Sequence, residues 1–89
     1  MIVRWTYGVD ATVSADGWLI LHCGRTARVF QYPPPYTVAW ISLQRHDGDI
    51  HLAADEIASS WREDQAEILV VIERWLQELR VAGLIHEGR

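Results

Sequence analysis

The longest regular pattern of hydrophobic and polar positions lies near the C-terminus, between Asp64 and Ile85. Its apolar residues recur at the i, i+3, i+4, i+7 spacing of one helix face, as Ile68, Ile72, Trp75, Leu76 and Leu79. Asp64 is a good N-cap with Glu67 as its capping-box partner. Gly83 followed by Leu84 is typical of a Schellman stop. The pattern predicts one long helix whose stripe faces the core.

The first half of this predicted helix is more apolar than packing on one side requires. Leu69, Val70 and Val71 lie outside the stripe and are apolar as well. These side chains either bind another molecule or contact residues 1–7 or a second copy of the chain. The residues alone leave both explanations open.

Earlier in the chain, short runs of strand-forming residues alternate with turn residues. The runs are Val9–Ser14, Trp18–Cys23 and Ala27–Tyr32. Asp16-Gly17 predicts a two-residue hairpin between the first two runs, and a second tight turn follows at residues 24–26. The third strand stops at three prolines and is the most amphipathic, so we expect it to be the open edge of an antiparallel sheet.

Two further helices are predicted between the prolines and the long helix. The first runs from about Tyr36 to Arg45, with Val38, Ile41 and Leu43 or Trp40 turned inward. The second runs from about Leu52 to Arg62, with Ile57 and Trp61 on its inner face. The expected fold is therefore α+β and winged-helix-like, with a three-stranded antiparallel sheet followed by three helices.

Length and composition narrow the functional classes. With 89 residues, residues 1–89 are expected to form a single domain. The net charge is −4 and lysine is absent, which argues against a nucleic-acid partner. No apolar run is long enough for a signal peptide or a membrane span, and a single cysteine fits a reducing compartment. We expect a cytoplasmic protein with no membrane partner.

Candidate chemistry is sparse. His46, Asp47, Asp49 and His51 form the densest group of potential ligands, but their spacing fits neither a calcium loop nor a zinc helix, so we expect a turn and no metal. His22 and Cys23 are adjacent on one strand and point to opposite faces, which excludes a dyad between them. No phosphate loop or nucleophile motif is present. The sequence predicts no catalysis and no cofactor.

Several short motifs resemble one known family in their order and spacing. They are Gln31-Tyr32-Pro33 at the end of the third strand, Asp47-Gly48, Glu56-Ile57-Ala58, and Ile72, Trp75, Leu76, Leu79, Gly83 and Leu84 on the last helix. Together they resemble the PqqD-like proteins, also called RiPP recognition elements, from about Val9 onward. Tyr-Pro-Pro-Pro replaces the family's Leu-Asn joint, and Val71 stands where an acidic residue is common.

The resemblance implies a non-catalytic peptide chaperone. Such a domain binds the leader segment of a ribosomally made precursor peptide and presents it to a modifying enzyme, such as a leader peptidase, a cyclase or a radical enzyme. The leader would add a strand beside the third strand, against the last helix. The implied peptide-binding residues are Arg28, Val29, Phe30, Gln31, Tyr32, Leu69, Ile72, Glu73 and Leu76. The third strand and the joint are similar to the separate recognition proteins of lasso-peptide clusters, and PQQ-type and other peptide-maturation pathways are the alternatives.

Two other functions compete with this interpretation. The predicted silhouette also fits a winged-helix DNA-binding regulator, although Glu67, Glu73 and Glu78 outnumber the arginines on the long helix. A homodimeric structural adaptor would instead use the surplus apolar residues of that helix to contact a second copy.

Overall fold

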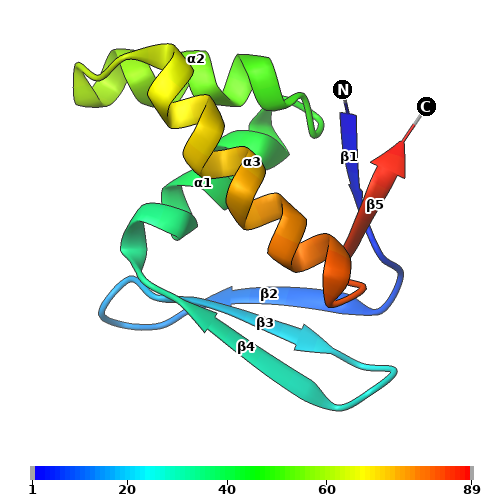
Figure 1. The fold of residues 1–89 in the computed structure, drawn as a ribbon. Coiled ribbons are helices and arrows are strands. Elements are labelled where there is room, and N and C mark those ends of the chain that lie inside the picture. The colour runs from blue at the N-terminus through cyan, green and yellow to red at the C-terminus, as the bar shows by residue number, and fades with distance from the viewer. Residues whose placement is uncertain (1, 89) are drawn as a thin grey trace.

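The computed structural model describes residues 2–88 and has the predicted α+β arrangement. Three strands precede three helices, as β2 (Val9–Val13), β3 (Leu19–Cys23), β4 (Arg28–Tyr32), α1 (Pro34–Arg45), α2 (Ile50–Trp61) and α3 (Gln65–Val81). Figure 1 shows the sheet along the bottom, the helices above it and α3 descending toward it. α1 and α3 therefore lie over one face of the three-stranded sheet, and α2 packs on these two helices.

β4 lies at an edge of this sheet, as the sequence predicts. The strand order is β2-β3-β4, with both pairs antiparallel. β4 pairs with β3 over its full length, from Tyr32 opposite Leu19 to Arg28 opposite Cys23. Within residues 2–88 no strand pairs with the other side of β4. Its outer backbone groups therefore point away from the sheet.

The turn between β2 and β3 is longer than the predicted two-residue turn. The Ser14 backbone N–H donates to the Trp18 carbonyl over 2.9 Å, and the Gly17 N–H donates to the Ser14 carbonyl over 3.0 Å. Ala15 and Asp16 thus lie in the loop together with Gly17, which has φ 89°. A glycine in the left-handed region after such a turn is typical of three-residue hairpins.

The structure has a second, two-stranded sheet that the sequence analysis does not predict. β1 (Ile2–Trp5) and β5 (Ile85–Gly88) pair antiparallel, with Trp5 opposite Ile85. Ile85, the last residue of the apolar pattern, therefore belongs to a strand, and the long helix ends at Val81, just before the predicted stop at Gly83. Each strand has only four residues, and in each a charged or imidazole side chain interrupts the apolar pattern. Figure 1 shows this ribbon beside the helices, with the two termini close together.

α1 begins earlier than predicted, at Pro34, and buries a different face. Trp40 and Leu43 are buried, whereas the exposed fractions of Val38 and Ile41 are 39% and 46%. The expectation that Val38 and Ile41 turn inward is wrong. Apolar residues occur on both faces of this helix, so the period alone does not identify the buried one.

The ends of α2 and α3 follow local rules. The Asp49 carboxylate accepts from the Leu52 backbone N–H, and Asp64 caps α3 by accepting from the Ala66 N–H. Beyond α3, the Leu84 N–H donates to the Leu79 carbonyl over 2.9 Å, which is the Schellman bond. Gly83 has φ 79°, the left-handed conformation that this stop requires.

The core lies between the helices and the sheet. Its largest fully buried side chains are Leu19, Leu21, Leu43, Leu76, Leu79, Leu84 and Val3. The stripe predicted on α3 faces this core, since Ile72, Trp75, Leu76 and Leu79 are all buried. None of the helices in the described part of the chain combines the length and the apolar content that a membrane crossing requires.

Candidate functional site

The side chains of β4 alternate between the two faces of the sheet. Arg28, Phe30 and Tyr32 lie opposite buried residues of β3, so they are on the face that the helices cover. Val29 and Gln31 are on the outer face, and the exposed fraction of Val29 is 50%. Of the five strand residues predicted to bind peptide, three lie on the side of α3 and two lie on the side away from it.

An aromatic cluster connects the end of β4 to α3. The Trp75 ring is centred 5.6 Å from the Tyr32 ring at 77° and 5.1 Å from the Tyr36 ring of α1. The rings of Tyr32 and Tyr36 are 5.9 Å apart. Tilted and edge-to-face pairs at these distances are favourable because each ring presents its positive edge to a negative face. The cluster positions α3 over the end of the edge strand.

The electrostatics of Tyr32 identify which residue of α3 faces it. Burial raises the pKa of the Tyr32 phenol, and the nearby carboxylate of Glu78 and the Tyr36 hydroxyl raise it further. The phenol therefore stays protonated near neutral pH and keeps an O–H that can donate a hydrogen bond. Glu78 thus belongs to the flank of α3 that faces β4.

Helix periodicity extends this flank along α3. Arg74 lies four residues before Glu78, and Val71 lies three residues before Arg74, so the three share one side of the helix. Val71 contacts the same hollow as Tyr36 and Trp75. We define the β4–α3 face as Arg28, Phe30 and Tyr32 of β4 together with Val71, Arg74 and Glu78 of α3.

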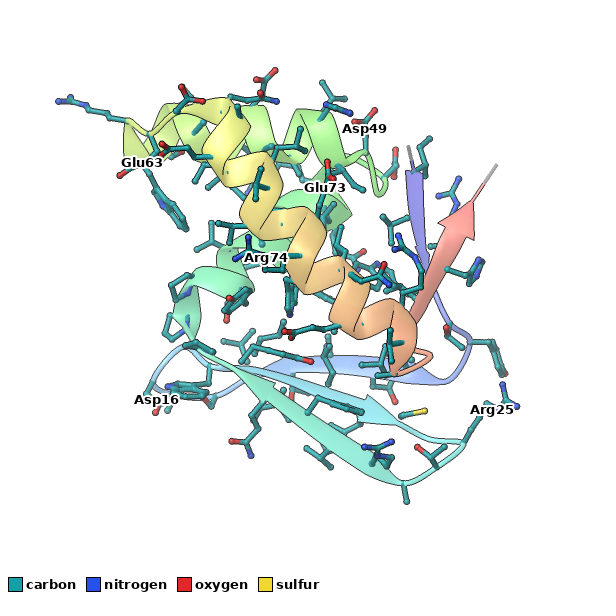
Figure 2. The ribbon with its side chains drawn as sticks, in the orientation of Figure 1. Asp16, Arg25, Asp49, Glu63, Glu73 and Arg74 are labelled. Carbon is teal, nitrogen blue, oxygen red and sulfur yellow. The ribbon has the colours of Figure 1, made fainter. Side chains whose placement is uncertain are left out.

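None of the four helix residues predicted to bind peptide belongs to the β4–α3 face, although Ile72 lines the hollow described below. Ile72 and Leu76 are buried in the core, with exposed fractions of 3% and 1%. Glu73 lies beside Ile50 at the start of α2, and Leu69, four residues earlier, is on the same flank and packs on the core. Figure 2 shows Glu73 on the α2 side of α3 and Arg74 on the other side. Leu69 and Glu73 therefore lie on the flank of α3 that faces the start of α2.

A hollow of about 190 Å³ opens at the α1 end of the β4–α3 face. It is lined almost entirely by apolar side chains from all three helices: Pro35, Tyr36, Ala39, Ile57, Trp61, Ile68, Val71, Ile72 and Trp75. The buried indole N–H of Trp75 has no hydrogen-bond partner among residues 2–88. The hollow continues the aromatic cluster, with which it shares Tyr36 and Trp75.

The surplus apolar residues of α3 now have distinct positions. Val71 lines the hollow together with residues of α1 and α2. Val70 is exposed to solvent over 54% of its surface. The N-terminal strand is held by β5 and by a hydrogen bond of 2.9 Å from the Val3 N–H to the Gly48 carbonyl. The residues that hold β1 thus do not include Val71, which lines a surface hollow together with residues of α1 and α2.

Several residues of this region are absent from the site that the sequence predicts, among them Tyr36, Trp61 and Arg74. Tyr36 enters because α1 starts at Pro34, which places the aromatic ring in the first turn beside Tyr32. Trp61, predicted to lie on the inner face of its helix, remains 42% exposed at the rim of the hollow. The sequence alone does not show which of the adjacent residues Glu73 and Arg74 faces β4, because this depends on how α3 lies over the sheet.

The polar group between α1 and α2 has structural roles. Asp49 caps α2, while His46 contacts the carboxylate of Glu56, which also accepts from Arg45 and from the Ser42 hydroxyl. Across residues 2–88 no three histidine, cysteine or carboxylate side chains gather as a metal site. Cys23 is buried and its neighbour His22 is exposed, as the strand alternation predicts.

Comparison with known proteins shows similarity at the level of structure. No family model matches the sequence, and no curated protein matches it. The solved structure of TbiB1 in complex with the TbiA(beta) leader peptide matches with a TM-score of 0.83 at 15% sequence identity, over 97% of this chain and 98% of that chain. The chain therefore shares the fold of TbiB1 over nearly its whole length.

Proposed function

We propose that this chain binds the leader segment of a ribosomally synthesised precursor peptide at the β4–α3 face and presents it to a modifying enzyme. The observation that carries this proposal is the unpaired edge of β4 beside α3. An extended peptide that adds to such an edge gains main-chain hydrogen bonds, while its alternate side chains reach pockets on either side. The mechanism is binding and presentation, without a catalytic step in this chain.

The outer edge of β4 is suited to strand addition. Natural edge strands are often protected by charges along their length or by prolines. In β4 only the first residue, Arg28, is charged, and the four residues that follow are uncharged. The prolines begin after the strand has ended, at Pro33. A peptide strand therefore meets no proline and no run of charges along β4.

The hollow beside Tyr36 supplies a site for one large apolar side chain of the peptide. Its lining is apolar, and Trp61 and Val71 at its rim are partly exposed in the free protein. Filling it removes apolar surface from water, at roughly 25 cal/mol for each Å² buried. The edge of β4 thus provides backbone affinity, and the hollow provides selection for an apolar anchor.

Two comparisons support the leader as the bound peptide. TbiB1, which shares this fold, was solved in complex with a leader peptide. The sequence motifs described above resemble those of the PqqD-like proteins, whose members bind leaders. The enzyme that would receive the peptide is a leader peptidase, a cyclase or a radical enzyme of the same biosynthetic cluster, with a lasso-peptide cluster as our first expectation.

A fluorescence-anisotropy titration tests the proposal. Labelled synthetic peptides would be taken from the N-terminal halves of short reading frames that neighbour the gene. We expect saturable binding of one of them, weakened at least about tenfold by Phe30→Asp. Val13→Asp places the same charge on the other edge strand, β2, and should leave binding unchanged. If every neighbouring peptide fails to bind the wild-type protein, the proposal is wrong.

Phe30 is half-buried, so the variant itself needs a check. Thermal melting of Phe30→Asp and Val13→Asp should show that both are folded at the titration temperature. Arg74→Glu offers a second test, because Arg74 is exposed and its substitution leaves the core intact. Reduced peptide binding by folded Arg74→Glu supports the β4–α3 face independently of Phe30.

A further inference from the structure

The charges of this acidic chain are unevenly distributed. Its net charge is −4, yet between Asp16 and Asp47 there is no aspartate or glutamate. That interval contains β3, β4 and α1, and its charged side chains are Arg25, Arg28 and Arg45. The hairpin formed by β3 and β4 is therefore cationic in a protein whose carboxylates lie in other segments.

One of these arginines, Arg28, lies at one end of the β4–α3 face. Arg28 is the first residue of β4 and is exposed, with its guanidinium carbon 5.1 Å from the centre of the Phe30 ring. This cation–π contact orients Arg28 along the helix-facing side of the strand. Arg25, labelled at the tip of the hairpin in Figure 2, lies in the turn before β4, and its side chain lies beside Gly8, just before β2, since a Cβ at Gly8 would be 4.0 Å from the Arg25 Cγ.

The opposite end of the same face is apolar. Tyr32, the last residue of β4, contacts Tyr36 and Trp75, which line the hollow. β4 has five residues, so at about 3.3 Å per step the two ends are roughly 13 Å apart. On α3, the two charged residues of this face, Arg74 and Glu78, are of opposite sign. The face thus runs from an apolar hollow to a cationic end.

We propose that Arg28 forms a subsite for a carboxylate side chain of the bound peptide. The inference rests on the proposed function and adds a charge requirement to it. The peptide would carry a large apolar residue in the hollow and an aspartate or glutamate about four residues away, the number of steps along β4. If the peptide continues the antiparallel sheet, the acidic residue is C-terminal to the apolar one.

Arginine suits this role because its planar guanidinium binds a carboxylate through two parallel hydrogen bonds. The subsite is open to solvent, so the ion pair contributes modestly to affinity. Its main effect is selection: an acidic residue at this register is favoured and a basic one is repelled. An edge strand without an arginine at this position would bind a peptide through the backbone but would show no preference for an acidic residue.

A selection from a displayed library of random peptides tests the inference even while the natural leader is unidentified. On the wild-type protein we expect enrichment of peptides with an aromatic or large aliphatic residue followed by an acidic residue at a fixed spacing. On Arg28→Glu the enriched residue at the acidic position should change to lysine or arginine. Arg4→Glu makes the same change of net charge on β1 and should preserve the acidic preference.

Synthetic peptides then give the size of the effect. A selected peptide with glutamate replaced by glutamine should bind the wild-type protein about threefold more weakly. With Arg28→Glu, the lysine version should bind better than the glutamate version, which a purely structural role of Arg28 would not produce. The difference between peptides should shrink as salt is raised.

The outcomes separate the two proposals. The carboxylate subsite is wrong if the enriched peptides depend on β4 but share no acidic position. It is also wrong if the acidic preference is unchanged on Arg28→Glu. Either result leaves the proposal of strand addition intact. A selection that yields no peptide sensitive to Phe30→Asp overturns the proposed function together with the subsite.

Discussion

The rings of Tyr32 and Trp75 meet edge to face, with centroids 5.6 Å apart and planes at 77°. Tyr32 ends the edge strand β4, and Trp75 lies in the middle of α3. This pair fixes which flank of α3 faces the open edge of the sheet. The position of that flank decides which residues a strand added to β4 would contact.

The first prediction concerns this pair. Tyr32→Leu should lower the free energy of unfolding by about 1 kcal/mol, because it keeps apolar volume but removes the edge-to-face contact with Trp75. Tyr32→Phe keeps the ring and serves as the control, with a smaller effect. Urea denaturation of the three proteins measures the difference. A Tyr32→Leu variant as stable as the wild type would mean that the ring contact does not position α3.

A second prediction separates the two flanks of α3. Val71→Glu and Arg74→Glu should weaken leader binding roughly tenfold, since both residues belong to the β4–α3 face. Glu73→Arg lies on the other flank and should change binding by less than about twofold. Anisotropy titrations of the three variants with one labelled leader peptide make the comparison. The reverse ranking would place the peptide beside Leu69 and Glu73, where the family resemblance places it.

A third prediction concerns the pH dependence of stability. The hydrogen bond from His46 holds the pKa of the Glu56 carboxyl below its usual value, with further contributions from Ser42 and Arg45. Because the folded-state pKa is depressed, the stabilisation is present above the unfolded-state pKa and is lost as the pH falls through the folded-state value. Glu56→Gln should therefore be less stable than the wild type at neutral pH and approach it in acid below about pH 4.

Thermal melting across this pH range provides the check. Asp55→Asn, an exposed neighbour on α2, controls for the loss of one carboxylate. A constant difference between Glu56→Gln and the wild type at every pH would show that ionisation of Glu56 does not contribute to stability.

A fourth prediction tests how β1 is attached. Gly48 has φ 86°, and a Cβ there would lie 2.1 Å from the Val3 carbonyl oxygen. Gly48→Ala should therefore displace β1 and lower the free energy of unfolding by more than about 2 kcal/mol. Gly83 also has a positive φ, but nothing lies within 4 Å of a Cβ there. Gly83→Ala should cost about 1 kcal/mol, the backbone contribution alone. Equal losses by urea denaturation would contradict the close contact with Val3.

The sequence predicts the elements that have strong local signals. The three-stranded sheet, its edge strand and the caps of α3 follow from alternation, prolines and the Asp64 and Gly83 positions. β1 and β5 could not be predicted in this way, because each has four residues and its partner lies at the other end of the chain. Their pairing is a tertiary contact with no local pattern.

The binding face is predictable only in part, for a similar reason. The helix-facing positions Phe30 and Tyr32 follow from the strand, but α3 carries apolar residues on both flanks, at Leu69 and at Val71. The spacing of apolar residues along α3 shows which residues are buried, but it does not show which flank of the helix lies next to β4. That choice depends on the crossing of α3 over the sheet, which the cluster of Tyr32, Tyr36 and Trp75 determines.

Amide hydrogen exchange along β4 tests strand addition most directly. With a saturating leader peptide, the outward N–H groups of β4 should exchange markedly more slowly, because they gain hydrogen bonds to the added strand. The N–H groups at the open edge of β2 serve as the internal control and should be unaffected. Protection that appears along β4 and not along β2 is the predicted result. Binding that leaves β4 exchange unchanged would contradict it.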